Sequence, residues 1–436
     1  MGIPDAKLRS LADAVASLRP DDTVGIPLGP GHPTGFLHAL GDRTDWTDLR
    51  MSGALLTDLY QVFMHPGVVF RSGFFGPAER FTRDSGGRIE FVPADFRRFA
   101  PLLDQLAPRV LATAATPPDA DGWMSLALHA GATVDGLHRA GADPDRVLLV
   151  EVNEGLPRTL GLPPEHTHAI HVDEADVIVE SDRPVFVLED PPATDIEKAI
   201  AGHAAAFIHD GCTLQTGIGG IPGSVAALLA NGPGGDYGIH SEMFTTGLMR
   251  LHQAGKVTNA RKGMHDGYSV TTFAAGTAEL YQWLDGNDEV RFLPVDLVNS
   301  PEAVARNANL VTINGALAID LAGQVVADSL GGKQFSGIGG HEDFISAAGM
   351  ELSDRSLVCL PSSFVKDGVA ASRIVGQLPA GTIVTTPRHQ LDVVVTEHGA
   401  AELRGLTVRE RARALAAIAD PVFRPELEAA AEEWPL

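Results

Sequence analysis

The chain has 436 residues with a hydrophobic fraction of 44%, and its 33 Lys and Arg against 56 Asp and Glu give a formal net charge of −23. The length predicts about two or three domains, and the composition is typical of a soluble α/β protein rather than a disordered one. A surface this acidic repels nucleic-acid phosphates and anionic lipids, so neither nucleic-acid nor membrane partners are expected.

Cysteine usage points to the compartment. Cys212 and Cys359 lie in separate apolar runs without a CxxC motif, which excludes a disulfide framework and favours a reducing environment. The N-terminus lacks the pattern of a secretory signal, and no apolar run approaches the roughly 18 residues of a membrane span. We therefore expect a cytoplasmic protein.

Short apolar runs alternate with helical patterns, which predicts βαβ units around mostly parallel sheets. In the first half, strands are expected at 23–28, 89–92, 110–114 and 147–152, and helices at 98–106 and 133–140. The proline-marked segment 184–194 interrupts this pattern and predicts a linker. We accordingly expect two domains, 1–190 and 195–436.

Beyond the linker the pattern resumes with a helix at 195–210, a strand at 212–216, a glycine turn at 217–222 and a helix at 224–230. Further strands are expected at 269–274, 309–314, 357–361, 383–386 and 392–396, with a hairpin at 316–327 and a helix at 407–419.

Glycines and polar residues gather at four of these strand ends, where open α/β sheets place ligands. The four stretches are 217–222, 238–243, 336–344 and 395–399. The first would leave backbone N–H groups free at a helix start, with Pro222 near the first helical position, and so could hold a phosphate or an oxyanion. Close packing of a strand against a helix explains the same glycines equally well. No Gly-Lys-Ser/Thr follows, and the glycine offsets do not fit a dinucleotide fingerprint.

The order and spelling of the motifs resemble the acetyl-CoA hydrolase/transferase family, and within it the 4-hydroxybutyrate CoA-transferases. The resemblance rests on 151–153 (EVN), 217–222 (GIGGIP), 238–243 (GIHSEM), 312–317 (TINGAL), 328–340 (DSLGGKQFSGIGG), 384–388 (VTTPR), 395–397 (VTE) and 403–405 (LRG). The first hundred residues match poorly. The implied fold is two CoA-transferase-type (NagB/RpiA/CoA-transferase-like) α/β domains with mostly parallel sheets and an active site in the cleft between them.

The resemblance also implies a carboxylate nucleophile at Glu242. A glutamate with a pKa near 4.3 is ionised at neutral pH and needs no general base to attack a thioester. Attack on an acyl-CoA gives an acyl-glutamyl anhydride, the CoA thiolate returns to form a glutamyl-CoA thioester, and a second carboxylate reverses the sequence. The implied kinetics are ping-pong, with acyl-CoA and a small carboxylic acid as partners, CoA as cosubstrate and no permanently bound cofactor.

Further site residues follow from the same resemblance. Asn314 and Glu397 match active-site positions, and CoA binding and the oxyanion hole are assigned to Gly217, Ile218, Gly219, Gly220, Ile221, Gly339 and Gly340. Cations beside the matched segments that could contact the CoA phosphates are Lys262, Lys333, Lys366 and Arg388. No metal site is expected, because the histidines at 166, 168 and 171 lack a supporting carboxylate pattern. A homo-oligomer, most simply a homodimer, is implied.

The chain departs from the family pattern in three places, one of which is Thr245-Thr246 after the Glu242 motif, where Ser-Asp is usual. His341 and Glu342 stand between Gly340 and Asp343, and His398 follows Glu397 where a tyrosine is usual. These residues could change acceptor specificity, or a histidine near its ordinary pKa of 6.5 could activate water and make the enzyme an acyl-CoA hydrolase. A non-catalytic acyl-CoA-binding protein is the remaining alternative.

Overall fold

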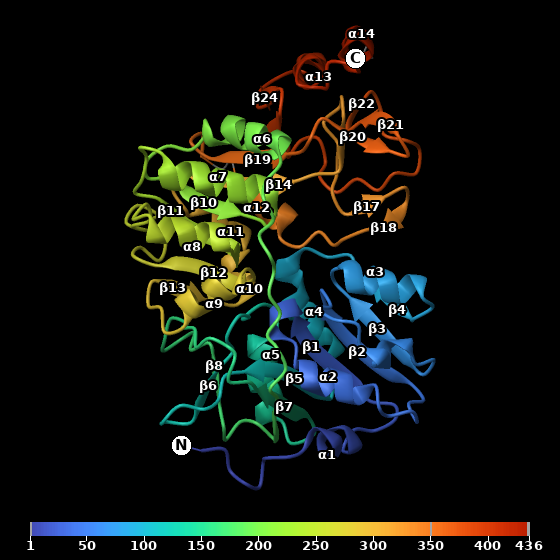
Figure 1. The fold of residues 1–436 in the computed structure, drawn as a ribbon, viewed down its shortest axis with the longest axis vertical. Helices are drawn as coiled ribbons and strands as arrows, with labels where there is room; N and C mark the ends of the chain where they lie inside the picture. Colours follow the sequence, from blue (N-terminus) through green and yellow to red (C-terminus); the bar gives the residue numbers. More distant parts are fainter. Residues whose placement is uncertain (1, 349–350, 434–436) are drawn as a thin grey trace. The chain divides into compact units, whose positions relative to one another are not determined.

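The computed structural model describes residues 2–348 and 351–433, which form two compact units (Figure 1). The first comprises Met1–Leu188 and Val270–Val298, and the second comprises Glu189–Ser269 and Asn299–Leu436. The first break falls inside the predicted linker, where residues 181–194 form neither helix nor strand. The predicted division into 1–190 and 195–436 did not anticipate that residues 270–298 belong to the first unit.

The first unit is built on a parallel sheet of strand order β4-β3-β2-β1-β5-β7-β9. Its strands are β1 (Thr23–Leu28), β2 (Leu49–Ala54), β3 (Val68–Ser72), β4 (Ile89–Phe91), β5 (Val110–Ala115), β7 (Val147–Val152) and β9 (Val177–Glu180). The helices between them are α1 (Leu11–Ala16), α2 (Thr34–Leu40), α3 (Pro77–Asp84), α4 (Phe99–Leu106) and α5 (Val134–Ala142), with 3-10 turns η1 (Gly29–Gly31), η2 (Gln61–Met64) and η3 (Phe96–Arg98).

Burial explains which of these strands could be predicted. Every residue of β5 is buried, and β7 is nearly so, because parallel strands covered on both faces are continuous apolar runs. The predictions at 23–28, 89–92, 110–114 and 147–152 are confirmed, as are the two helices. β2 and β3 were missed because Arg50, Ser52 and Arg71 interrupt their apolar pattern.

The same unit also contains an antiparallel pair and the elements of its second segment. They are β6 (Trp123–Ser125) with β8 (Ala169–His171), then β12 (Ser269–Ala274), α9 (Ala278–Leu284), β13 (Val290–Phe292) and α10 (Val295–Val298). The strand predicted at 269–274 is confirmed.

The second unit contains the strand order β11-β10-β14-β19-β23-β24, parallel except for its last pair. These strands are β10 (Thr213–Thr216), β11 (Gly238–Phe244), β14 (Leu310–Gly315), β19 (Arg355–Cys359), β23 (Val393–Thr396) and β24 (Gly399–Glu402). The chain order reverses at β10, so the loops that follow β10 and β14 diverge there and leave room for a ligand at the carboxyl ends of the strands.

Helices α6 (Asp195–Ala205), α7 (Gly220–Asn231) and α8 (Thr246–Gln253) accompany this sheet, followed by α11 (Pro301–Ala305), α12 (His341–Ala347), α13 (Val408–Ala417) and α14 (Arg424–Glu432). Capping boxes start α6 and α13, where Thr194 and Thr407 accept from the amides of Glu197 and Glu410. α7 begins four residues before its predicted start, at Gly220, which makes Pro222 its third residue rather than its first. α6 ends five residues earlier than predicted.

Small strands complete the second unit: β15 (Ala318–Asp320), β16 (Val325–Val326), β17 (Ser329–Leu330), β18 (Lys333–Gln334), β20 (Ser363–Lys366), β21 (Val369–Ser372) and β22 (Ile374–Val375). The antiparallel pairing of β15 with β16 confirms the predicted hairpin. The strand predicted at 383–386 is wrong, because only Thr386 makes a bridge, to Val325. Ile383 and Val384 are exposed there, outside any sheet.

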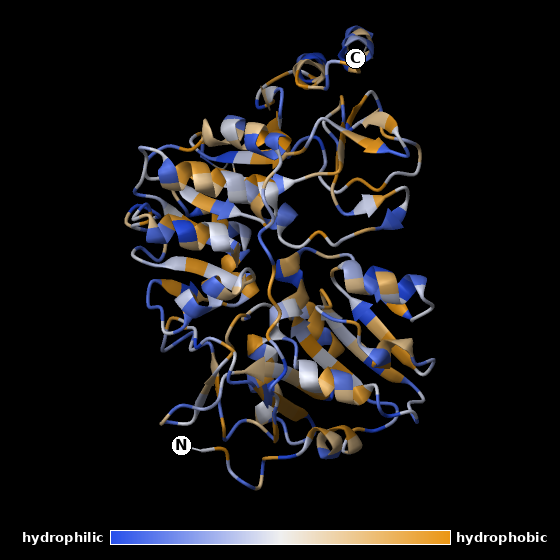
Figure 2. Ribbon diagram, viewed as in Figure 1, coloured by the Kyte–Doolittle hydropathy of each residue, from blue (hydrophilic) through white to orange (hydrophobic). Residues whose placement is uncertain are grey.

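Apolar residues concentrate on the sheet strands, while the helices alternate apolar and polar positions (Figure 2). One core lies around β1, β2 and β3 and includes Phe36, Phe63 and Phe70, and another includes Leu321, Val394 and Leu415. Within 2–348 and 351–433, no helix is long and apolar enough to cross a bilayer.

Candidate active site

The glycine turn after β10 has the strand, turn and helix order expected from the sequence. Gly219 has a φ of +123°, a backbone conformation that L side chains rarely adopt, and α7 starts at the next residue. A Cβ on Gly220 would lie 2.2 Å from the Glu197 carboxylate, so this carboxylate sits against the helix start. The first-turn amides of α7, including that of Ile221, have no acceptor within the helix and are suited to bind negative charge.

Glu242 lies near the carboxyl end of β11, beside this turn in the sheet. The hydroxyl of its neighbour Ser241 accepts from the Thr216 amide and donates to the Thr216 carbonyl, and Thr216 immediately precedes Gly217. The Glu242 side chain is partly buried, and its Oε2 accepts a hydrogen bond from Asn299 Nδ2 at 2.6 Å.

The protonation of Glu242 differs from the expectation. Burial raises the pKa of its carboxyl to about 8; the Asn299 hydrogen bond opposes this shift, and the negative charge of Asp343 adds to it. The sequence-based assumption of a carboxylate fully ionised at neutral pH is therefore wrong for this structure. Desolvation is a tertiary effect that the motif around Glu242 does not encode.

Asn299 and Asp343 lie close to Glu242, and neither was assigned a role from the sequence. Both are fully buried, and Asn299 Nδ2 also donates to Asp343 Oδ2 at 2.9 Å. Asn299 follows α10 and precedes Ser300, which caps α11. A polar residue between an apolar run and a helix start was the sequence feature that could have pointed to it. Asp343 lay within the stretch 336–344, but nothing in that stretch distinguished it.

The second glycine loop meets Glu242 directly. Gly339 has a φ of +56°, and Gly340 precedes α12. A Cβ on Gly340 would lie 1.8 Å from Glu242 Oε2 and 2.5 Å from Asn299 Nδ2, so only glycine fits against the carboxylate. The structure thus brings Glu242 and the 339–340 loop together, as the motifs implied.

The other two expected catalytic residues lie at strand ends with different partners. Asn314, near the end of β14, donates from Nδ2 to Gln215 Oε1 at 3.4 Å. Glu397 follows β23 and accepts from the amide and the hydroxyl of Ser362 at 2.9 and 2.6 Å. His398 Nε2 lies 3.6 Å from Glu397 Oε1. These contacts orient both side chains.

The two unusual residues at the start of α12 turn toward Thr386. His341 Nε2 is 2.9 Å from Thr386 Oγ1, and Thr386 Oγ1 donates to Glu342 Oε1. Burial lowers the pKa of His341 to about 4, although the nearby charge of Asp328 opposes the shift. The pKa of His341 therefore lies below the ordinary histidine value near 6.5 on which the water-activation alternative depended, and His341 is neutral at neutral pH.

The structure divides the four candidate phosphate contacts. Lys262 is fully buried and donates from Nζ to the Tyr268 carbonyl, and burial lowers its pKa to about 7. Its assignment to a CoA phosphate is wrong for this conformation. Lys333, Lys366 and Arg388 are exposed and stay predictions.

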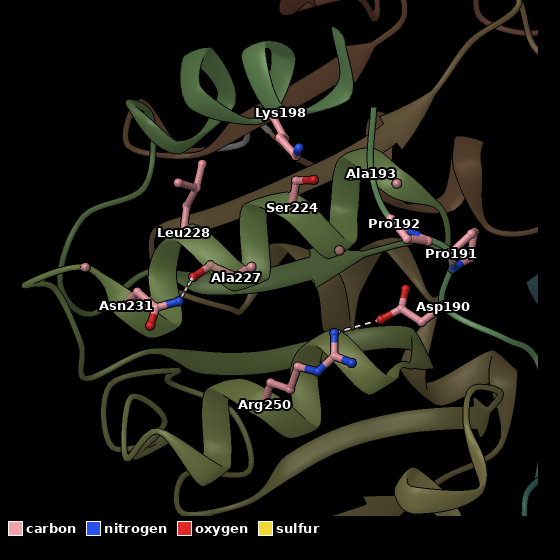
Figure 3. Close-up of a pocket in the computed structure, with 13 residues that line it drawn as sticks. Asp190, Pro191, Pro192, Ala193, Lys198, Ser224, Ala227, Leu228, Asn231 and Arg250 are labelled. Atoms are coloured by element: carbon pink, nitrogen blue, oxygen red, sulfur yellow. Dashed lines mark hydrogen bonds and ion pairs between the residues drawn. The ribbon is translucent and has the colours of Figure 1, made fainter. Parts of the chain in front are cut away.

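A groove beside α7 carries two cations that the sequence analysis missed (Figure 3). Its volume is about 710 Å³, and it is lined by Pro191 and Pro192 of the linker and by the small residues Gly220, Gly223, Ser224 and Ala227 of α7. Lys198 of α6 and Arg250 of α8 extend into this region, and Arg250 pairs with Asp190 at 2.7 Å. Lys198 and Arg250 are single cations on separate helices far apart in the chain, so no basic run marked the groove in the sequence.

Comparison with known proteins places this geometry in a family. A family model for the acetyl-CoA hydrolase/transferase C-terminal domain matches residues 276–431. The chain is 40% identical to 4-hydroxybutyrate coenzyme A transferase of Clostridium kluyveri, across 90% of this chain and 92% of that protein. It is 36% identical to succinyl-CoA:cyclohexane-1-carboxylate CoA transferase of Geobacter metallireducens, across 98% and 95%.

Similarity to an acetyl-CoA hydrolase of Neurospora crassa is lower, at 28% identity across 73% of this chain and 65% of that protein. Among solved structures, RipA from Yersinia pestis superposes with a TM-score of 0.89 at 32% identity, across 98% of each chain. Because these similarities extend over nearly the whole chain and its fold, the chain belongs to the acetyl-CoA hydrolase/transferase family of enzymes.

Proposed function

We propose that this enzyme is a CoA-transferase that moves CoA between a short-chain acyl-CoA and a carboxylic acid through a glutamyl-CoA thioester on Glu242. The observation that carries the proposal is the close contact of the Glu242 carboxylate with Asn299 and Gly340. Asn299 aims the Glu242 oxygen by a 2.6 Å hydrogen bond, and Gly340 leaves no room for a side chain between its own backbone and that oxygen. Relatives that cover nearly the whole chain are named CoA transferases.

The chemistry suits such a carboxylate. The ionised Glu242 attacks the thioester carbonyl, a C–O bond forms and the C–S bond breaks with its electron pair on sulfur, which gives an anhydride and the CoA thiolate. The thiolate then attacks the glutamyl carbonyl and releases the first acid. With a pKa near 8, about one Glu242 in ten is ionised at pH 7, but a more basic carboxylate is also a stronger nucleophile.

Each tetrahedral intermediate carries an oxyanion, and two sets of backbone donors could bind it. We assign this role to the amides of Ile221 and Gly340, one in each glycine loop, where a single donor contributes roughly 3 to 4 kcal/mol. Asn314 and Glu397 are proposed to orient the reacting carbonyl and the thiolate. His341, Glu342 and His398 are proposed to influence which acid is accepted.

The groove beside α7 is proposed to hold part of the CoA nucleotide. It begins at Gly220, within the glycine turn 217–222, and Lys198 and Arg250 offer the positive charge that a phosphate requires. On a chain of net charge −23 an anionic ligand must be attracted locally. Binding energy gained there can support the anhydride step at the distant thioester.

The location and assembly remain part of this proposal. Both cysteines are free and buried, which supports a cytoplasmic enzyme, and a homodimer is inferred from the family resemblance alone.

The decisive experiment incubates the enzyme with acetyl-CoA, with and without a panel of carboxylic acids, and measures thioester exchange and intact mass. We expect turnover only with an added acid, ping-pong kinetics, and a mass increase that maps to Glu242 after trapping. Glu242→Gln should abolish exchange, whereas Glu402→Gln, at an exposed position on β24, should retain it. Thioester loss without any acid would establish a hydrolase instead, and an active enzyme never modified at Glu242 would refute the covalent mechanism.

A further inference from the structure

One amide group connects the partly buried carboxyl group of Glu242 with the fully buried one of Asp343 in the second unit. An asparagine Nδ2 carries two hydrogens, and both have acceptors here: Glu242 Oε2 at 2.6 Å and Asp343 Oδ2 at 2.9 Å. Because both oxygens contact one nitrogen, they lie at most 5.5 Å apart, the sum of these two distances. Asn299 and Asp343 are fully buried, so solvent screens this arrangement weakly.

Other titratable groups lie on the elements that carry this pair. On α12, His341 and Glu342 turn toward Thr386. On β11, the ring of His240 lies against Phe344, at 6.3 Å between ring centres. The negative charge of Asp343 raises the pKa of Glu242, in the same direction as burial.

We propose that Asp343 is a positioning residue for Glu242: it holds the Asn299 amide toward the nucleophile and places a negative charge beside the carboxylate that attacks the thioester. This inference rests on the proposed role of Glu242 and goes beyond it. Two like charges this close cannot both form cheaply in a desolvated site. Glu242 therefore becomes a more basic and more nucleophilic carboxylate than an isolated buried glutamate with a neutral neighbour.

Proton balance in the first chemical step follows from this arrangement. Glu242 gives its proton to solvent, attacks the thioester carbonyl as a carboxylate, and the C–S bond electrons leave with sulfur. Once Glu242 is acylated in the anhydride it carries no charge, so the repulsion from Asp343 disappears. The charge of Asp343 thus destabilises the free carboxylate relative to the covalent intermediate.

The test is the pH dependence of kcat/KM for acetyl-CoA with a fixed acceptor, measured for the wild type and for Asp343→Asn. In the wild type we expect activity to rise with pH through a midpoint near 8. Asp343→Asn should move that midpoint down by about one pH unit, because burial still raises it, and should lower the high-pH plateau of kcat/KM by about tenfold. A change in stability alone would not move the midpoint.

Asp392→Asn is the matched control. Asp392 is another buried carboxylate of the second unit, but its partners are the Ser356 amide and Arg404. We expect its midpoint to equal that of the wild type. If Asp343→Asn does not fold, Asp343→Ser replaces it, since it also removes the charge and retains an acceptor oxygen.

An unchanged midpoint in the folded variant overturns the positioning role, and so does a wild-type midpoint below about 6. Covalent trapping separates this outcome from failure of the proposed function. Labelling at Glu242 with an unmoved midpoint refutes only the role of Asp343, whereas absence of labelling in active enzyme refutes the nucleophile itself.

Discussion

Gly340→Ala tests the closest approach in the candidate site with the smallest possible change. The new Cβ would lie 1.8 Å from Glu242 Oε2, so the oxygen would have to move by about 1.6 Å to reach an ordinary contact of 3.4 Å. The backbone itself tolerates alanine, since the φ of Gly340 is −92°. The whole effect therefore falls on the position of the carboxylate and on its hydrogen bond with Asn299.

A displacement of about 1 Å at a reacting group typically costs about 100-fold in rate, and the lost hydrogen bond to a charged group corresponds to roughly 1.5 to 3 kcal/mol. We expect kcat to fall at least 100-fold in the thioester exchange assay, with a smaller change in KM for acetyl-CoA. Gly202→Ala on α6 is the control, because its Cβ meets nothing within 4 Å and should leave the rate unchanged. A Gly340→Ala enzyme with nearly wild-type kcat would show that Glu242 does not act from this position.

Three further predictions concern other parts of the molecule. Asn299→Ala removes the hydrogen bond that lowers the pKa of Glu242, so the midpoint of the pH–rate profile should move upward and kcat should fall about 100-fold; a downward shift contradicts the assignment. Lys198→Ala and Arg250→Ala should each raise KM for acetyl-CoA by about 3- to 10-fold without changing KM for an acyl-pantetheine that lacks the nucleotide, and equal changes for both donors would exclude the groove as the nucleotide site. Burial lowers the pKa of His129 to about 3, so the unfolded chain binds a proton below pH 6.5 that the folded chain does not. The free energy of unfolding should therefore fall as the pH drops, and this group should account for about 2 kcal/mol of the loss at pH 5. In urea unfolding, His129→Phe should lose that part of the acid sensitivity. The control His389→Phe, at an exposed position, should keep the acid sensitivity of the wild type.

Much of the architecture was readable from the sequence because buried parallel strands are continuous apolar runs. β1, β7 and β12 have the predicted bounds, and the order of strand, glycine turn and helix around Gly219 was correct apart from the helix start. Glu242 and the 339–340 loop were found by motif spelling, and the structure places them in contact. These features depend on local patterns, which a sequence displays directly.

Features that depend on neighbours distant in the chain were decided only by tertiary structure. Asn299 lies 57 residues from Glu242, and Asp343 lies 44 residues from Asn299, so their shared amide is invisible before folding. Burial raises the pKa of Glu242, for which the sequence suggested a freely ionised carboxylate. The fold also places Lys262 in the interior, where the sequence suggested a phosphate contact. The residue types were determined by the sequence, but desolvation and charge proximity belong to the packed state, because both depend on which groups the fold removes from water together.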